Sequence, residues 1–205
     1  MTGQALLREK VYDPILRLLH AWNGLAILLL VFTSQAAEAL EFTPEAASLW
    51  RLHVWTGYAL VLGLVGRLAW GLNGPWYARL SAMWHWRAWL TALRTRRLFT
   101  APRGFGHHPL ASAAYLGFYL VVLVMALTGL ALAAIDQGRG PLYPWLGHAI
   151  TLKHLFSEPH EILEKFVWFF ILLHIAALIL HEARHGVPLA QAMVSGYQYR
   201  KEEEE

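Results

Sequence analysis

Long apolar runs dominate the pattern of the chain. Four of them, with few charged positions, cover about residues 15–37, 49–72, 110–135 and 160–181. Each reaches the roughly 20 residues that an α-helix needs to cross the hydrocarbon core of a bilayer. Apolar and polar positions do not alternate within the runs, so the pattern offers no support for strands. The sequence therefore predicts an all-α membrane protein, a four-transmembrane-helix bundle that forms a single membrane-embedded domain over 1–205.

Proline and glycine punctuate these runs. Prolines precede or open each run, at a place where a helix tolerates the missing N–H; they are Pro14, Pro44, Pro109 and Pro159. Gly71, near the end of the second run, and Gly74-Pro75, just after it, are expected to end its helix. The first run is too long for the core of a signal peptide and no A-x-A-like site follows it closely, so we expect a permanent span.

The composition agrees with a lipid environment. Hydrophobic residues make up 57% of the chain and charged residues 15%, against roughly 25% charged in soluble domains. The 10 tryptophans suit two membrane interfaces. Cysteine is absent, which excludes disulfides, cysteine-ligated iron–sulfur clusters and covalent haem attachment. A metal centre must therefore use histidine, methionine or carboxylate ligands.

Positive charge is concentrated on one side of the predicted bundle. The connection between the second and third runs carries only basic charges, Arg79, Arg87, Arg94, Arg96, Arg97 and Arg103. Further basic residues flank the first run or follow the last, namely Arg8, Lys10, Arg17, Arg184, Arg200 and Lys201. The segment Glu38–Glu45 contains no basic residue. The positive-inside rule thus predicts cytoplasmic N- and C-termini, a cytoplasmic arginine-rich connection, and Glu38–Glu45 and Asp136–Glu158 outside.

The arginine-rich connection has a pattern of its own. Tryptophans and arginines mix over Leu80–Arg97, as in an interfacial amphipathic helix. We expect such a helix on the cytoplasmic side between spans two and three. It would either anchor the chain to anionic lipids or bind a specific partner.

Four histidines within the spans carry the candidate chemistry, because ionisable groups in a membrane are costly. His160 and His174 are 14 residues apart, which places them on one helix face and roughly 21 Å apart. With the predicted topology, His20 matches the depth of His174, and His53 that of His160. Two imidazoles can ligate haem iron and leave no open position for oxygen chemistry. The pattern predicts two non-covalent haem b groups, bound by His20–His174 and His53–His160, and electron transfer.

Other residues fit the same interpretation. The first two of these histidines are followed four positions later by Gly24 and Gly57, which leave room for a flat porphyrin. Arg17 and Arg67 stand where they can bind haem propionates. The alternatives are that glycine is simply frequent in membrane helices, that the arginines snorkel to the interface, and that a lone histidine bonds a neighbouring helix.

Several segments resemble motifs of the bacterial di-haem cytochromes b, a family that includes the cytochrome b subunit of nickel–iron hydrogenases. They are Val11-Tyr-Asp-Pro-Ile-Leu-Arg-Leu-Leu-His20, Arg51-Leu-His53 with Gly57-Tyr58, Arg67-x-x-Trp70-Gly71, Tyr77-Ala-Arg79, Gly106-His-His-Pro109 and Ala192-Met-Val-Ser-Gly-Tyr197. The spacing of His160 and His174 is also that of the family. Two features depart from it: Ala21 stands where tryptophan is usual, and the segment between spans three and four is shorter than in the hydrogenase subunits.

The resemblance implies a function and partners. It implies His20, His53, His160 and His174 as axial ligands, a periplasmic redox partner, and a quinone as the reactant on the membrane side. We expect a bacterial inner-membrane subunit that passes electrons between a periplasmic oxidoreductase, foremost a nickel–iron hydrogenase, and the quinone pool. The alternatives are exchange with a periplasmic cytochrome c and a self-contained superoxide:quinone oxidoreductase. A haem-free anchor or transporter would make the matching histidine depths accidental.

A quinone site is expected near the cytoplasmic ends of spans one and four. Its candidate residues are Arg17, His181, Arg184 and His185. Imidazole relays protons near neutral pH, and arginine can donate hydrogen bonds to a quinone carbonyl. The alternative is that these residues only anchor helix ends among the headgroups. In that case the quinone is expected near Trp50 and Trp55.

Overall fold

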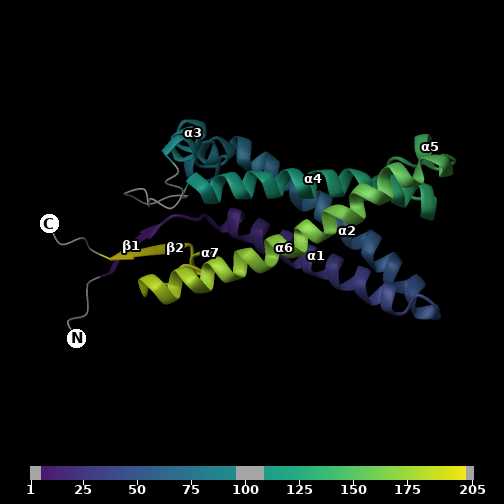
Figure 1. The fold of residues 1–205 in the computed structure, drawn as a ribbon, viewed down its shortest axis with the longest axis horizontal. Helices are drawn as coiled ribbons and strands as arrows, with labels where there is room; N and C mark the ends of the chain where they lie inside the picture. Colours follow the sequence, from purple (N-terminus) through teal and green to yellow (C-terminus); the bar gives the residue numbers. More distant parts are fainter. Residues whose placement is uncertain (1–5, 96–108, 202–205) are drawn as a thin grey trace. The chain divides into compact units, whose positions relative to one another are not determined.

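Four long α-helices dominate the computed structural model, which describes residues 6–95 and 109–201. They are α1 (Pro14–Ala39), α2 (Pro44–Asn73), α4 (Pro109–Gln137) and α6 (Lys153–His185) (Figure 1). A membrane-spanning segment long and apolar enough to cross a bilayer is found in each of the four. The prediction of an all-α, four-span membrane protein is confirmed.

The helix starts follow the predicted signals in three cases. The backbone N–H of Leu16 donates to the Asp13 carboxylate at 2.9 Å, so Asp13 caps α1 just before Pro14. Pro44 and Pro109 likewise open α2 and α4. The prediction that Pro159 opens the fourth span is wrong, because Pro159 lies inside α6. An interior proline removes one backbone hydrogen bond, a loss that membrane helices tolerate.

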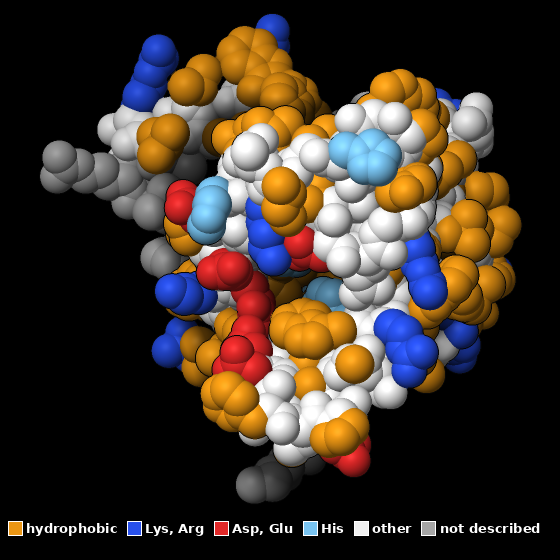
Figure 2. Space-filling model, turned by 90° about the vertical axis from the view of Figure 1, so that its right-hand side faces the viewer, with side chains coloured by type: hydrophobic (Ala, Val, Ile, Leu, Met, Phe, Trp, Pro, Cys, Tyr) orange, Lys and Arg blue, Asp and Glu red, His pale blue; other side chains and the backbone are white. Residues whose placement is uncertain are grey.

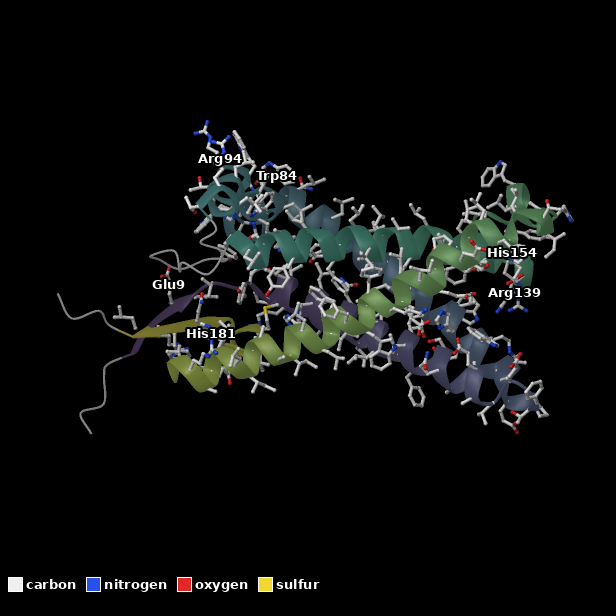
Figure 3. All side chains as sticks on the ribbon, in the orientation of Figure 1. Glu9, Trp84, Arg94, Arg139, His154 and His181 are labelled. Atoms are coloured by element: carbon white, nitrogen blue, oxygen red, sulfur yellow. The ribbon has the colours of Figure 1, made fainter. Side chains whose placement is uncertain are left out.

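Short elements fill the connections. They are the 3₁₀ turns η1 (Trp76–Ala78), η2 (Leu80–Met83) and η3 (Ile150–Leu152), and the helices α3 (Trp86–Thr95), α5 (Tyr143–Leu146) and α7 (Ala192–Ser195). Trp84 and Arg94 project from the η2–α3 segment (Figure 3). α3 is helical within the predicted amphipathic segment, whose last residues, Arg96 and Arg97, lie outside the described part. Its position at a membrane interface stays a prediction.

None of the four apolar runs contains a strand, as expected, but two short strands outside the runs were not predicted. β1 (Leu6–Lys10) and β2 (Tyr197–Lys201) pair antiparallel, with Leu6 opposite Lys201 and Lys10 opposite Tyr197 (Figure 1). The Arg8 guanidinium lies 3.6 Å from the centre of the Tyr197 ring, a cation–π contact. The two strands come from opposite ends of the sequence, so no local pattern could indicate their pairing.

The described chain divides into two compact units, and each long helix contributes a segment to both. The central unit consists of Ala21–Gly66 and Phe118–Phe169. The terminal unit consists, in its described part, of residues 6–20, 67–95, 109–117 and 170–201. The prediction of one domain over the whole chain stays a prediction.

The central unit has its own apolar core. Ala26, Leu60 and Val122 are buried together, and they come from α1, α2 and α4. Beside this core, Gly63 lets α1 approach α2 closely, since a side chain there would overlap Asn23. The Trp22 indole donates across the same contact to the Ala59 carbonyl at 2.8 Å. Small residues at close helix contacts are typical of membrane packing.

Candidate functional site

A cavity in the central unit brings together two of the predicted histidines. Its volume is about 720 Å³, and His53 of α2 and His160 of α6 both line it. Cofactor pockets commonly have volumes of roughly 300–1,000 Å³ and mostly apolar walls. The Trp50 ring, also in the lining, packs edge-on against His53 with 5.6 Å between ring centres. The cavity therefore has the size and lining of a cofactor site.

Glycines keep part of this cavity wall flat. A Cβ atom at Gly57 would meet no protein atom within 4 Å, so open space adjoins the helix at that position. A Cβ atom at Gly129 would lie only 3.2 Å from Cε1 of His160. Both glycines line the cavity. A Cβ atom at Gly24 on α1 would likewise meet nothing within 4 Å. Gly129 was not predicted from the sequence, because no histidine stands four positions before it.

Both histidine rings of the cavity are hydrogen-bonded through Nδ1. Nδ1 of His53 lies 3.1 Å from the Leu30 carbonyl oxygen and 3.2 Å from the Thr33 hydroxyl. Nδ1 of His160 lies 2.9 Å from the Thr128 hydroxyl. Neither threonine was predicted from the sequence pattern. The available signal was a hydroxyl residue within an otherwise apolar run.

One end of the cavity is polar and acidic. Glu164, one turn after His160 on α6, accepts hydrogen bonds from Ser34 at 3.1 Å and Gln35 at 3.0 Å. Lys153 and Asp136, which also line the cavity, form an ion pair at 3.0 Å. Figure 2 shows acidic side chains gathered beside a hollow that contains a histidine.

The other predicted pair, His20 of α1 and His174 of α6, lies in the terminal unit. The two side chains are close enough to interact electrostatically. The ring of His174 is parallel to that of Phe170, with 5.9 Å between centres, and edge-on to Tyr115 at 6.2 Å. In the part of the chain that the structure describes, no hydrogen bond reaches the ring nitrogens of His20 or His174. His174 is therefore flanked by aromatic rings, whereas His53 and His160 are each bonded to a threonine hydroxyl.

Arg17 makes contacts that the sequence did not indicate. Its guanidinium donates to three successive backbone carbonyls, those of Met193, Val194 and Ser195 at the end of α7. The Gly196 backbone (φ 86°) is left-handed and packs against the Tyr12 carbonyl. Burial raises the pKa of the Tyr12 phenol, with the nearby Tyr115 as a second cause, so Tyr12 stays neutral at physiological pH. Arg17 thus ties the C-terminal segment to the start of α1.

The remaining candidates are Arg67 and the other predicted quinone-site residues, His181, Arg184 and His185. Arg67 is 7% exposed and lies against Gly71. Its side chain is therefore buried in the protein and does not extend to the surface, as the snorkelling alternative would require. His181 is half-buried and Arg184 is exposed, while the side chain of His185 lies outside the described part. Figure 3 shows where His181 projects from α6. No described contact joins Arg17 to His181 or Arg184.

The donor set of the cavity fits a haem better than a metal held by the protein alone. Among the described residues, no group of three or more histidine, cysteine, aspartate or glutamate side chains is placed to hold a metal ion. Two imidazoles lining one cavity, with flat glycine surface beside them, match an iron whose remaining ligands come from a porphyrin. The four histidines and two arginines remain predicted haem-binding residues.

Comparisons with known proteins give one family and several relatives. The family model described as prokaryotic cytochrome b561 matches residues 11–196. A probable Ni/Fe-hydrogenase B-type cytochrome subunit of Cupriavidus necator is 26% identical, over 98% of this chain and 91% of the relative. Proteins with the same description from Azotobacter vinelandii and Rhodobacter capsulatus are each 27% identical, over 98% and 94% of this chain and 94% and 82% of their own lengths. No solved structure matches the chain.

Proposed function

Because this chain belongs to the prokaryotic cytochrome b561 family, and so is a membrane b-type cytochrome of electron transfer, we propose that it is the membrane subunit linking a nickel–iron hydrogenase to the quinone pool. The names of its relatives support the hydrogenase partner. The similarity extends over nearly the whole chain and most of each relative.

The observation that carries the proposal is the pair His53 and His160, which line one cavity from two different helices. We assign one haem b to this pair and a second to His20–His174. Each haem, when bound, supplies reversible one-electron transfer. The protein supplies the imidazoles, the apolar enclosure and, at Gly57, the flat surface against which a porphyrin can lie.

With the proposed topology, the N- and C-termini and the arginine-rich connection between α2 and α4 lie on the cytoplasmic side of a bacterial inner membrane. The segments Glu38–Glu45 and Asp136–Glu158 then face the periplasm, and the second of them carries Arg139 and His154 (Figure 3). We propose that the periplasmic partner binds these segments. The quinone site is proposed near His181 and Arg184, with Arg17 supporting it through the C-terminal segment. Imidazole supplies a proton relay there, and arginine a hydrogen-bond donor.

Purification of the affinity-tagged chain in mild detergent, followed by haem and partner analysis, tests the proposal. We expect two extractable haem b groups per chain, a co-purifying iron–sulfur hydrogenase, and reduction of both haems by H₂. Addition of a quinone analogue should then reoxidise them. Rapid exchange with a soluble cytochrome c, or superoxide-dependent quinone reduction by the isolated chain, would replace the hydrogenase assignment with the corresponding alternative. A chain without haem would contradict the whole proposal.

Quinone reduction in variants tests the site separately. His181→Gln and Arg184→Gln should each lower turnover while both haems are retained, because these residues are not proposed ligands. Normal turnover in both variants would contradict this location and direct the search to Trp50 and Trp55.

A further inference from the structure

Two threonines in the central unit make the same unusual contact. Thr33 of α1 has 0% exposure and Thr128 of α4 has 8%. The Thr33 hydroxyl lies 2.8 Å from the Leu29 carbonyl oxygen and 3.0 Å from that of Leu30. The Thr128 hydroxyl lies 2.9 Å from the carbonyl of Val124 and 3.0 Å from that of Met125. Each hydroxyl therefore donates its single hydrogen to its own helix.

A hydroxyl that has donated its hydrogen can only accept from further neighbours. Each threonine oxygen has one such neighbour, Nδ1 of a histidine on another helix: His53 for Thr33 and His160 for Thr128. Nδ1 must therefore carry the hydrogen in both rings. The Leu30 carbonyl, which accepts only, requires the same of His53. In a neutral imidazole this leaves the lone pair on Nε2.

We propose that Thr33 and Thr128 are matched positioning residues, which hold His53 and His160 as the Nδ1–H tautomer and present Nε2 of each to one haem iron. This inference rests on the proposed haem at that pair. Each ligand is oriented from a neighbouring helix, His53 by α1 and His160 by α4. All four long helices thus contribute either a ligand or its orienting group. Such a partner also makes the imidazole a more basic ligand.

Valine replaces the hydroxyl with a methyl group and nearly keeps the shape of threonine, so Thr33→Val and Thr128→Val are the test variants. Thr33→Ser and Thr128→Ser keep the hydroxyl and should resemble the wild type. Thr56→Val is the matched control, because Thr56 is a buried threonine of the same unit that makes no hydrogen bond to any histidine in the described part of the chain. His53→Ala identifies the signals of the central haem by their loss.

Three properties of the central haem are measured: its transfer rate to excess apomyoglobin, the g values of its ferric low-spin EPR signal, and its midpoint potential. We expect each valine variant to lose this haem about 10- to 100-fold faster. Its g values should change because the ring is freed to turn, and its potential should rise because the ligand is less basic. The His20–His174 haem of the same molecule should remain unchanged.

Wild-type values of all three properties in both valine variants would overturn the inference while leaving the proposed function intact. A wild-type chain without haem would overturn the proposed function itself. If a valine variant lost both haems, Thr33→Ala or Thr128→Ala would be measured in its place, since alanine cannot overfill the site. Unchanged transfer rate and g values in the alanine variants would equally reject the inference.

Discussion

The two histidine pairs lie in surroundings of different chemistry. In the central unit, hydroxyl and carbonyl oxygens accept from the rings of His53 and His160, and the Glu164 side chain lies one turn from His160. In the terminal unit, His174 is flanked by the rings of Phe170 and Tyr115. Hydrogen bonds fix a tautomer and a ring plane, whereas ring stacking fixes a plane but leaves the tautomer open. Equal ligands can therefore give unequal redox centres.

The expected result of this difference is a lower midpoint potential for the haem of the central pair. Basic imidazole ligands and a nearby carboxylate both stabilise the oxidised iron. With the proposed orientation, electrons entering from a periplasmic partner would move from the lower potential to the higher one.

The largest expected effect is loss of one haem from a ligand variant. His53→Ala and His160→Ala should each lower the haem content from two per chain to one and remove the same spectral species. His20→Ala and His174→Ala should remove the other species. Pyridine haemochrome content per chain and difference spectra measure this. If His20→Ala and His160→Ala abolished one common species, the proposed pairing would be wrong.

Filling the open space beside Gly57 should have the next largest effect. Gly57→Leu places a side chain where the cavity is open, so it should exclude most of the central haem and spare the terminal one. Haem content by spectral deconvolution measures the loss. Val65→Leu, at an exposed position of the same helix, is the control and should retain both haems. Full central haem content in Gly57→Leu would mean that the porphyrin lies elsewhere.

Neutralising Glu164 should raise the potential of the central haem. The Glu164 carboxylate interacts more favourably with the oxidised haem than with the reduced haem. A difference of about 1.4 kcal/mol between these two interactions corresponds to roughly 59 mV for one electron, so we expect a shift of several tens of millivolts in Glu164→Gln. Glu161→Gln is the control: Glu161 lines the same cavity but is exposed and more strongly screened. Potentiometric titration of both haems decides the matter. Equal shifts in the two haems would contradict a local effect.

The smallest expected effect concerns Arg17. Arg17→Gln loses hydrogen bonds to the α7 carbonyls and should destabilise the protein by about 1–3 kcal/mol. A chain of this size should then melt several degrees lower, roughly 2–4 °C per kcal/mol. Arg94→Gln, at an exposed position of α3, should melt like the wild type. Loss of quinone turnover at an unchanged Tm would instead favour a direct role of Arg17 in the quinone site.

The one-dimensional pattern was enough to predict the four spans. Their length and apolar content follow from the thickness of a bilayer, which acts on each segment separately. The starts of α1, α2 and α4 were also predicted, because prolines act locally on the helix that they open. Pro159 was misjudged for the same reason: a local rule cannot show that the helix continues on the other side of the proline.

The sequence by itself determined that four histidines lie within the apolar runs, and it predicted in which pairs their depths match. Only the tertiary structure decided what surrounds them: Thr33 and Thr128 on the imidazoles, Gly129 beside His160, and Arg17 on the α7 carbonyls. The strand pairing of Leu6–Lys10 with Tyr197–Lys201 is of the same kind. Each of these contacts joins residues of different helices or of opposite chain ends. Their partners are set by how the helices pack, which local hydrophobicity and spacing do not encode.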